Sequence, residues 1–160
     1  LTEFGRSVVR RANELNVIID IAHASPAMVE DVLALSTAPL MLSHGGLKGA
    51  CDTERNLPDV LMKKFASKGG LVGIGYWDAA VCDPTPEGIV KSIRYAIDLL
   101  GLEHVALGSD YDGTIHAPFD TSEVAVLTEV MLQSGFSEDE IRKVMGENAK
   151  RFLLENLPAR

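Results

Sequence analysis

The sequence has few of the features that mark membrane proteins, disulfide scaffolds or nucleic-acid-binding proteins. Its two cysteines, Cys51 and Cys82, are too few for a small disulfide scaffold and lack the CxxC spacing of zinc or thioredoxin-like motifs. The longest apolar runs, such as residues 71–76, are far shorter than the roughly 20 residues that span a bilayer. The 15 Lys and Arg residues against 23 Asp and Glu residues give a net charge of −8, which repels phosphate backbones and anionic headgroups. We therefore expect no nucleic-acid partner and no membrane segment.

The N-terminal end lacks an initiator methionine, a basic segment and the apolar stretch of a signal peptide. Thr2 instead has the features of a helix N-cap, followed by an apolar stripe in a helix that ends at Asn16. Because a crossover helix normally follows a strand, we expect a fragment that forms one domain over residues 1–160. The cysteine count leaves the compartment open. We expect a cytoplasmic protein, with the periplasm and secretion as alternatives.

The middle of the chain alternates between short apolar segments and amphipathic segments. Strands that are apolar along nearly their whole length predict a parallel sheet covered by helices, and hence an α/β fold. An open doubly wound sheet and a (β/α)8 barrel both satisfy this pattern, although a dinucleotide site is excluded because residues 73–78 lack the third glycine of the fingerprint. The expected strands are 17–22, 40–43, 71–75 and 105–108, and the expected helices are 2–16, 25–36, 58–67, 87–100, 122–133 and 137–156.

Polar residues follow the predicted strands at their carboxyl ends, the edge where parallel α/β folds carry their chemistry. His23 and His44 end two strands that would lie about 4.8 Å apart, so both imidazoles can reach a common ion. The alternative is that each histidine is hydrogen-bonded and packs on the rim. Two histidines at equivalent positions favour a metal site, which needs at least one further ligand.

Three other residues at this rim have side chains suited to substrate chemistry. Asp110 ends the fourth strand, where it could act as a base or bind a substrate amine. Arg55 could hold a substrate carboxylate in a bidentate contact, or else be solvated on the surface. Tyr76 follows the third strand and offers a hydroxyl, although it could also pack against the loops.

Five segments together resemble the membrane (renal) dipeptidase family of zinc peptidases, peptidase family M19, in its bacterial form. They are residues 19–25 (IDIAHAS), 42–45 (LSHG), 51–56 (CDTERN), 75–78 (GYWD) with Cys82, and 107–113 (LGSDYDG). The resemblance runs in order over essentially the whole chain. It implies the C-terminal half, strands five to eight, of a TIM-type (β/α)8 barrel in a binuclear zinc enzyme that hydrolyses dipeptides.

The resemblance also implies a role for each matching residue. His23 and His44 resemble the two histidine ligands of one zinc ion. Arg55, together with Tyr76, resembles the group that holds the dipeptide carboxylate. Asp110 resembles the acid that handles the substrate amine and the proton transfer. Cys51 and Cys82 resemble a pair that is disulfide-linked in secreted relatives and that would remain free thiols in a reducing cytoplasm.

Other groups that the family requires are missing from these 160 residues. They are a His-x-Asp pair on the first strand, a bridging Glu, and a substrate-binding His on the fourth strand. We therefore expect the isolated chain to bind zinc weakly and to have little or no dipeptidase activity, its partner being the N-terminal half of the barrel. The alternatives are a related metal-dependent amidohydrolase with another substrate and a non-catalytic half-barrel that buries its open sheet edges by forming a homodimer.

Overall fold

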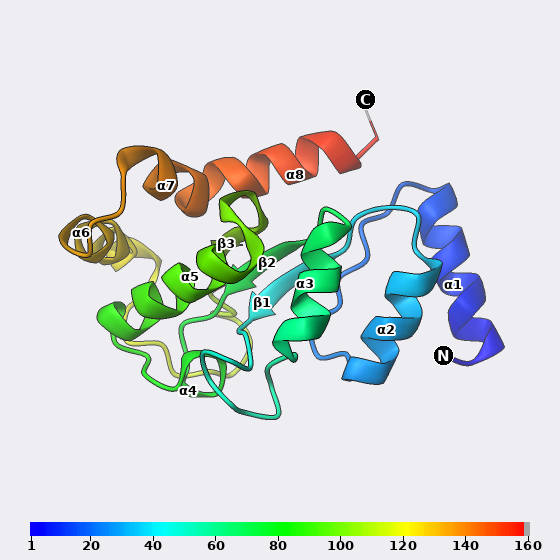
Figure 1. Cartoon of the computed structure of the whole chain (residues 1–160), viewed down its shortest axis with the longest axis horizontal. Helices are drawn as coiled ribbons and strands as arrows, with labels where there is room; N and C mark the ends of the chain where they lie inside the picture. The colour runs from blue at the N-terminus through cyan, green and yellow to red at the C-terminus, as the bar shows by residue number, and fades with distance from the viewer. Residues whose placement is uncertain (159–160) are drawn as a thin grey trace.

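A parallel sheet of three strands lies at the centre of the molecule (Figure 1). The structure, a computed structural model, describes residues 1–158. The strands are β1 (Met41–Gly45), β2 (Leu71–Ile74) and β3 (Val105–Leu107), paired in the order β1-β2-β3. The central strand β2 is buried along its whole length. The prediction of an α/β fold with a parallel sheet is confirmed.

Helices connect and cover the strands. Thr2, Ser25, Thr85 and Ser137 each accept a backbone N–H bond at the start of a helix, as N-cap residues do. None of the helices in residues 1–158 is long and apolar enough to cross a bilayer. The helices are α1 (Glu3–Glu14), α2 (Pro26–Leu35), α3 (Asp59–Ser67), α4 (Asp78–Val81), α5 (Pro86–Leu100), α6 (Ala125–Gln133), α7 (Glu138–Arg142) and α8 (Asn148–Asn156), with short 3-10 turns η1 (Leu102–His104) and η2 (Thr121–Glu123) and a π-type turn η3 (Lys143–Glu147).

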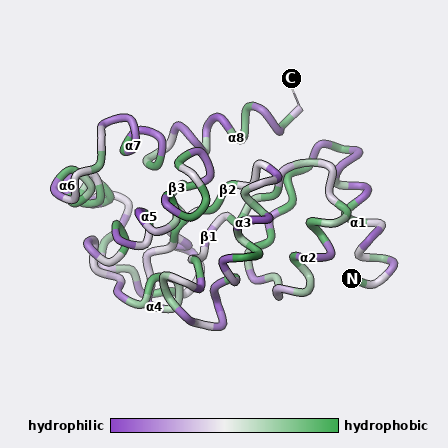
Figure 2. The backbone as a smooth tube through the Cα atoms, viewed as in Figure 1, coloured by the Kyte–Doolittle hydropathy of each residue, from purple (hydrophilic) through white to green (hydrophobic). Residues whose placement is uncertain are grey.

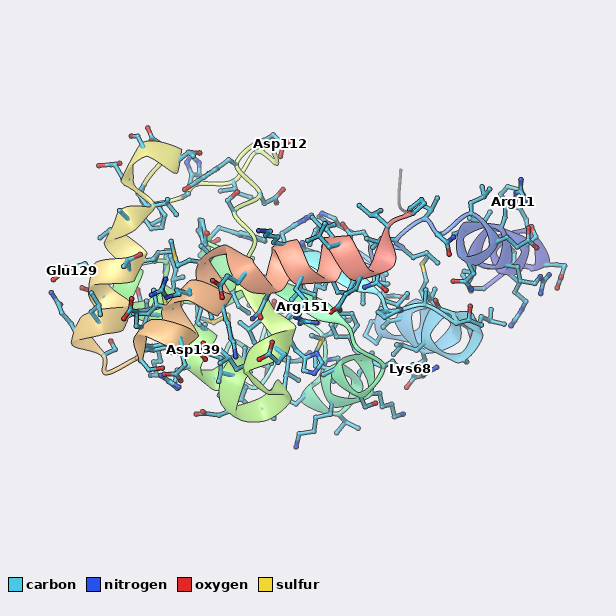
Figure 3. All side chains as sticks on the ribbon, turned by 90° about the horizontal axis from the view of Figure 1, so that it is seen from above. Arg11, Lys68, Asp112, Glu129, Asp139 and Arg151 are labelled. Atoms are coloured by element: carbon cyan, nitrogen blue, oxygen red, sulfur yellow. A yellow bond between two sulfur atoms is a disulfide. The ribbon has the colours of Figure 1, made fainter. Side chains whose placement is uncertain are left out.

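The two faces of the sheet bury different sets of side chains. Val72, Ile74 and Val105 join the main core, which α3 and α5 cover in front of the sheet (Figure 1). The opposite face holds a smaller cluster in which Phe152 of α8 packs on Leu71 and Ala106. Figure 3, seen from above, shows α8 lying across the sheet, and Figure 2 shows hydrophilic residues on the outer turns of α7 and α8. Successive side chains along a strand point to opposite faces of the sheet, so each strand contributes to both clusters and both faces are covered.

The prediction of a strand over 17–22 is wrong, so the described residues contain three strands where the sequence pattern indicated four. This segment makes one parallel bridge, between Asp20 and Met41. The Ile21 N–H donates to the Met41 carbonyl (2.8 Å) and the Met41 N–H donates to the Ile19 carbonyl (3.0 Å). The segment thus lies beside β1 in the expected direction, but pairs over a single residue.

A side chain interrupts this pairing. In a continuing parallel ladder, the Ser43 N–H would donate to the Ile21 carbonyl. It donates instead to Oδ1 of Asp20 (3.0 Å), and the Ile21 carbonyl accepts the N–H of Ala24 in a turn (3.0 Å). The carboxylate of Asp20 therefore replaces the backbone acceptor that the next ladder bond would need.

The prediction of one helix over 137–156 is also incomplete. The capping box at Ser137 and Glu140 forms as predicted. Gly146 then has non-helical angles (φ 172°, ψ −28°), so the helix divides into α7 and α8 around η3. Glycine weakens a helix interior because it gains the most backbone freedom on unfolding, which accounts for the break at this position.

Candidate metal and substrate site

The rim formed by the carboxyl ends of the strands brings together the loops that carry the candidate residues. The hydroxyl of Thr53, in the loop after β1, donates to the carbonyl of Ala79 after β2 (2.6 Å). Tyr76, which follows β2, packs against Tyr111 and Phe119 from the segment after β3, with ring centroids 5.8 and 5.3 Å apart. Three segments that are distant in sequence therefore form one surface at this end of the sheet.

His23 and His44 face each other across this rim. Their Nε2 atoms are 3.0 Å apart and their rings meet edge to face. His23 lies in a left-handed turn (φ 64°) directly after the bridged segment, and His44 lies near the end of β1. Two nitrogens that each lie about 2.0–2.1 Å from one zinc ion are roughly 2.9–3.4 Å apart at bond angles of about 90–109°. The spacing of the two Nε2 atoms fits a shared ion.

The surroundings of His44 favour the neutral imidazole that metals bind. Burial lowers the pKa of His44, and nearby Arg55 and His23 lower it further, against the opposing effects of Asp110 and Asp20. Nδ1 of His44 lies 2.8 Å from the hydroxyl oxygen of the neighbouring Ser43, so the ring is held on the side away from His23. A neutral, oriented imidazole is the form in which histidine ligates metals.

Two histidines do not complete a coordination sphere. Within residues 1–158, no group of three or more His, Cys, Asp or Glu side chains is arranged to hold a metal ion. Imidazole nitrogen suits zinc and similar transition metals, which take at least three protein ligands at catalytic sites. The donor chemistry and the spacing of the two histidines therefore fit part of a metal site.

Asp110 faces the histidine pair from the turn after β3. Its Oδ1 lies 3.8 Å from Nε2 of His44, and its side chain is largely buried. Asp110 has a left-handed backbone (φ 56°), and its carbonyl accepts the N–H of Gly113 (2.8 Å). A Cβ atom at Gly113 would lie only 2.2 Å from Oδ1 of Asp110, so glycine is required for this close approach. The nearby Asp112, by contrast, is exposed on the loop that leads away from the sheet (Figure 3).

Arg55 is half-buried. The sequence had left open that its side chain extends into solvent, and the structure does not show that arrangement. Its Nη2 donates to the backbone carbonyl of His44 (2.8 Å), and its Cζ lies 5.5 Å from the ring centroid of Trp77. Burial lowers the pKa of Arg55, while Asp110 and Asp20 raise it. An arginine guanidinium stays charged in proteins and carries five N–H donors in a planar fork, so this residue places a cation next to the histidine pair.

Tyr76 forms a buried wall of the site, since only 2% of its surface is exposed. Burial raises the pKa of Tyr76, and the neighbouring Tyr111 raises it further, so the phenol stays protonated at neutral pH. Its position among aromatic rings agrees with packing against the loops. The contact between its hydroxyl and a substrate stays a prediction.

A disulfide in the structure joins Cys51, in the loop after β1, to Cys82, directly after α4. Asn56 lies between the same two segments, where its buried amide donates to the carbonyls of Cys51 (2.9 Å) and Ala80 (2.8 Å). These links fix the loop on which Arg55 lies, immediately before Asn56.

The residue that sequence reasoning missed is Asp20. Its carboxylate contacts the N–H of Ala22 and both the N–H and the hydroxyl of Ser43, next to His44. A charged residue within the apolar segment 17–22 was the signal that could have identified it, because an unpaired carboxylate is costly between apolar neighbours.

Comparison with known proteins assigns the family. Residues 1–157 match the sequence profile of the membrane dipeptidase family, peptidase family M19. The chain belongs to this family. Dipeptidase tcpJ of Claviceps purpurea (strain 20.1) is 31% identical over 163 residues, a match that covers 97% of this chain and 38% of the relative.

Solved structures of this M19 fold superpose closely on the chain. A metallo peptidase from Rhodobacter sphaeroides, solved with a phosphinate mimic of the dipeptide L-Ala-D-Ala, has a TM-score of 0.90 and 29% identity, covering 98% of this chain and 47% of that one. The M19 metallo peptidase dipeptidase AC has a TM-score of 0.92 and 28% identity, covering 99% and 48%. This M19 chain therefore spans half or less of the length of these relatives.

Proposed function

We propose that this chain forms the C-terminal half, strands five to eight, of a (β/α)8 barrel in a zinc-dependent dipeptidase. The superposition with two family members over 98% and 99% of the chain supports the arrangement of the strands and helices. The bridged segment around Asp20 would then be the edge of strand five, and β1, β2 and β3 would be strands six, seven and eight. Joining the N-terminal half would continue the sheet beyond the single bridge between Asp20 and Met41.

The observation that carries the proposal is the 3.0 Å separation of the two Nε2 atoms of His23 and His44, with Asp110 and Arg55 beside them. We assign the two histidines as ligands of one zinc ion in a two-metal centre. The remaining ligands would come from the half of the barrel that this chain does not contain. Zinc, when bound, lowers the pKa of water to about 7 and polarises a carbonyl, which is the chemistry that peptide hydrolysis needs.

The other residues of the site act on the two ends of a dipeptide. The guanidinium of Arg55 binds the C-terminal carboxylate, since a planar fork matches the two carboxylate oxygens. The carboxylate of Asp110 binds the N-terminal ammonium and accepts and returns a proton during hydrolysis. The phenyl ring of Tyr76 forms the wall between these groups. A substrate with one free carboxylate and one free amine fits the two opposite charges.

The proposal is tested by a chimera in which this chain replaces the superposable part of the Rhodobacter sphaeroides metallo peptidase. We expect the chimera to bind zinc and to hydrolyse L-Ala-D-Ala, whereas the isolated chain has little or no activity. D110N should remove the activity of the chimera, and D112N, which makes the same change on the exposed part of the loop, should retain it. A folded, zinc-loaded chimera that hydrolyses no dipeptide would refute the proposal.

A further inference from the structure

Three side chains form a continuous hydrogen-bonded series at the open edge of the sheet. Oδ2 of Asp20 accepts the hydroxyl of Ser43, and that hydroxyl oxygen lies 2.8 Å from Nδ1 of His44. Oδ1 of Asp20 accepts two backbone N–H groups, from Ala22 and Ser43, each at 3.0 Å. Both carboxylate oxygens are thus held in place, and the series ends on the ring whose other nitrogen faces His23.

The direction of the hydrogen bonds follows from the chemistry of the first residue. A carboxylate has no hydrogen to donate, so the single hydrogen of the Ser43 hydroxyl points to Asp20. The hydroxyl oxygen then offers only lone pairs to His44, and the 2.8 Å contact requires that Nδ1 of His44 carries the hydrogen. In a neutral imidazole, Nε2 is then the unprotonated nitrogen with its lone pair free.

The contact between the two histidines is consistent with this assignment. Their Nε2 atoms lie 3.0 Å apart, so in the absence of metal one ring donates and the other accepts. The pair alone leaves the donor undefined. The series from Asp20 makes His44 the acceptor and His23 the donor.

We propose that Asp20, acting through Ser43, is a positioning residue that fixes His44 as the Nδ1–H tautomer and directs its Nε2 lone pair toward the metal position next to His23. The use of this lone pair for metal rests on the proposed function. The tautomer itself does not, because it is set in the metal-free chain by Asp20 and Ser43. Asp20 also replaces a ladder bond of β1, so one carboxylate both ends the pairing with that strand and orients the histidine near its end.

The substitution D20N reverses the direction of the hydrogen bonds in the series while the side chain keeps nearly the same shape. The amide oxygen can keep both backbone bonds, whereas the amide nitrogen now donates to the Ser43 hydroxyl oxygen. The Ser43 hydrogen is then free to point at Nδ1 of His44, which favours the Nε2–H tautomer. S43A removes the middle member, S43T keeps a hydroxyl at the same place, and D52N removes a negative charge from a mostly exposed side chain as the matched control.

The first measurement is the tautomer of His44 in the metal-free chain, from long-range 1H–15N correlations of 15N-histidine-labelled protein. We expect Nδ1–H in the wild type, S43T and D52N, and an increase of the Nε2–H form in D20N and S43A. A wild-type spectrum with hydrogen on Nε2 would overturn the proposal without recourse to any variant. The same conclusion would follow if D20N left the tautomer unchanged.

The second measurement is the zinc affinity of the dipeptidase chimera and of its variants, by competition with a chelating dye at fixed pH. Loss of a group that orients a metal ligand typically weakens metal binding by about 10–100-fold, and we expect a loss of that order in D20N. S43T, which keeps the hydroxyl, and D52N should both bind zinc as tightly as the wild type. Equal affinities of D20N and D52N would refute the role of Asp20 in metal binding. A dipeptidase chimera without activity would instead refute the proposed function and leave the tautomer result standing.

Discussion

Substitution of Gly73 by alanine tests how the end of β1 is shaped at the site. The pairing of β1 with β2 shifts by one residue between Leu42 and Gly45, so Ser43 and His44 lie in a bulge. The carbonyl of Ser43 tips over β2 as a result. A Cβ atom at Gly73 would lie 2.3 Å from that oxygen, and one at Gly108 would lie 2.4 Å from it.

The size of the effect follows from these distances. Real Cβ contacts are essentially never shorter than 3.0 Å, so in G73A the Ser43 carbonyl has to recede by about 0.7 Å from its 2.3 Å position. Overpacking of this kind costs about 1–3 kcal/mol of stability. Because Ser43 and His44 are adjacent, the ring moves with the carbonyl. Metal–ligand distances tolerate only about ±0.2 Å, so we expect zinc affinity to fall by at least about tenfold.

The assay is urea denaturation of the chain together with zinc titration of the dipeptidase chimera, with G146A as the control in both. G146A is the same change of glycine to alanine made in open space, since a Cβ atom at Gly146 has nothing within 4 Å. Both variants lower the entropy of the unfolded chain similarly, and G146A also removes the glycine that weakens the helix between α7 and α8, so a loss of stability in G73A alone reports the clash. Equal unfolding midpoints and equal zinc affinities for G73A and G146A would refute this account of the bulge.

Three further predictions concern the loops and the last helices. Reduction of the Cys51–Cys82 disulfide, which spans 31 residues, should lower the free energy of unfolding by about 3–4 kcal/mol, and a loss below about 1 kcal/mol in urea titrations with and without reductant would contradict this. R55K in the dipeptidase chimera should raise KM for L-Ala-D-Ala more than it lowers kcat, because lysine keeps the charge but not the planar fork; an unchanged KM would argue against carboxylate binding. Hydrogen bonds from Arg94 and from the N–H and hydroxyl of Ser137 lower the pKa of Glu140 from 4.5 to about 2, so its stabilisation is complete above pH 4.5 and is lost as the pH falls through 2. E140Q should therefore cost about 1–2 kcal/mol at pH 7 and much less at pH 2, as measured by denaturation at both values.

The strand and helix pattern was sufficient for the parallel α/β fold, and the resemblance of five short segments was sufficient for the family. Alternating apolar and amphipathic segments predicted the strands that became β1, β2 and β3, because burial on both faces leaves a continuous apolar run that is easy to recognise. The same pattern placed His23 and His44 at the same rim, and the structure brings their rings together. Their role as zinc ligands remains a proposal.

The parts that could not be predicted depend on side chains that compete with backbone pairing. The carboxylate of Asp20 takes the N–H of Ser43, and this ends the pairing of residues 17–22. Hydrophobic periodicity reports which face of a segment is buried, but it is insensitive to a bond between one side chain and one backbone group. The bulge in β1 and the short helix α4 escaped prediction for a similar reason, since local hydrogen bonding decides both.

The incomplete donor set has a thermodynamic consequence for the proposed barrel. Residues 1–158 hold the pair of histidines proposed as ligands but no cluster of three or more donors, and His23 lies exposed at the open edge of the sheet. In the proposed enzyme the ion therefore contacts both halves of the barrel at once. Linkage then requires that zinc tighten the association of the halves by the same factor by which association tightens zinc binding. The metal concentration, and not only the contacts between strands, would set how much of the barrel is assembled.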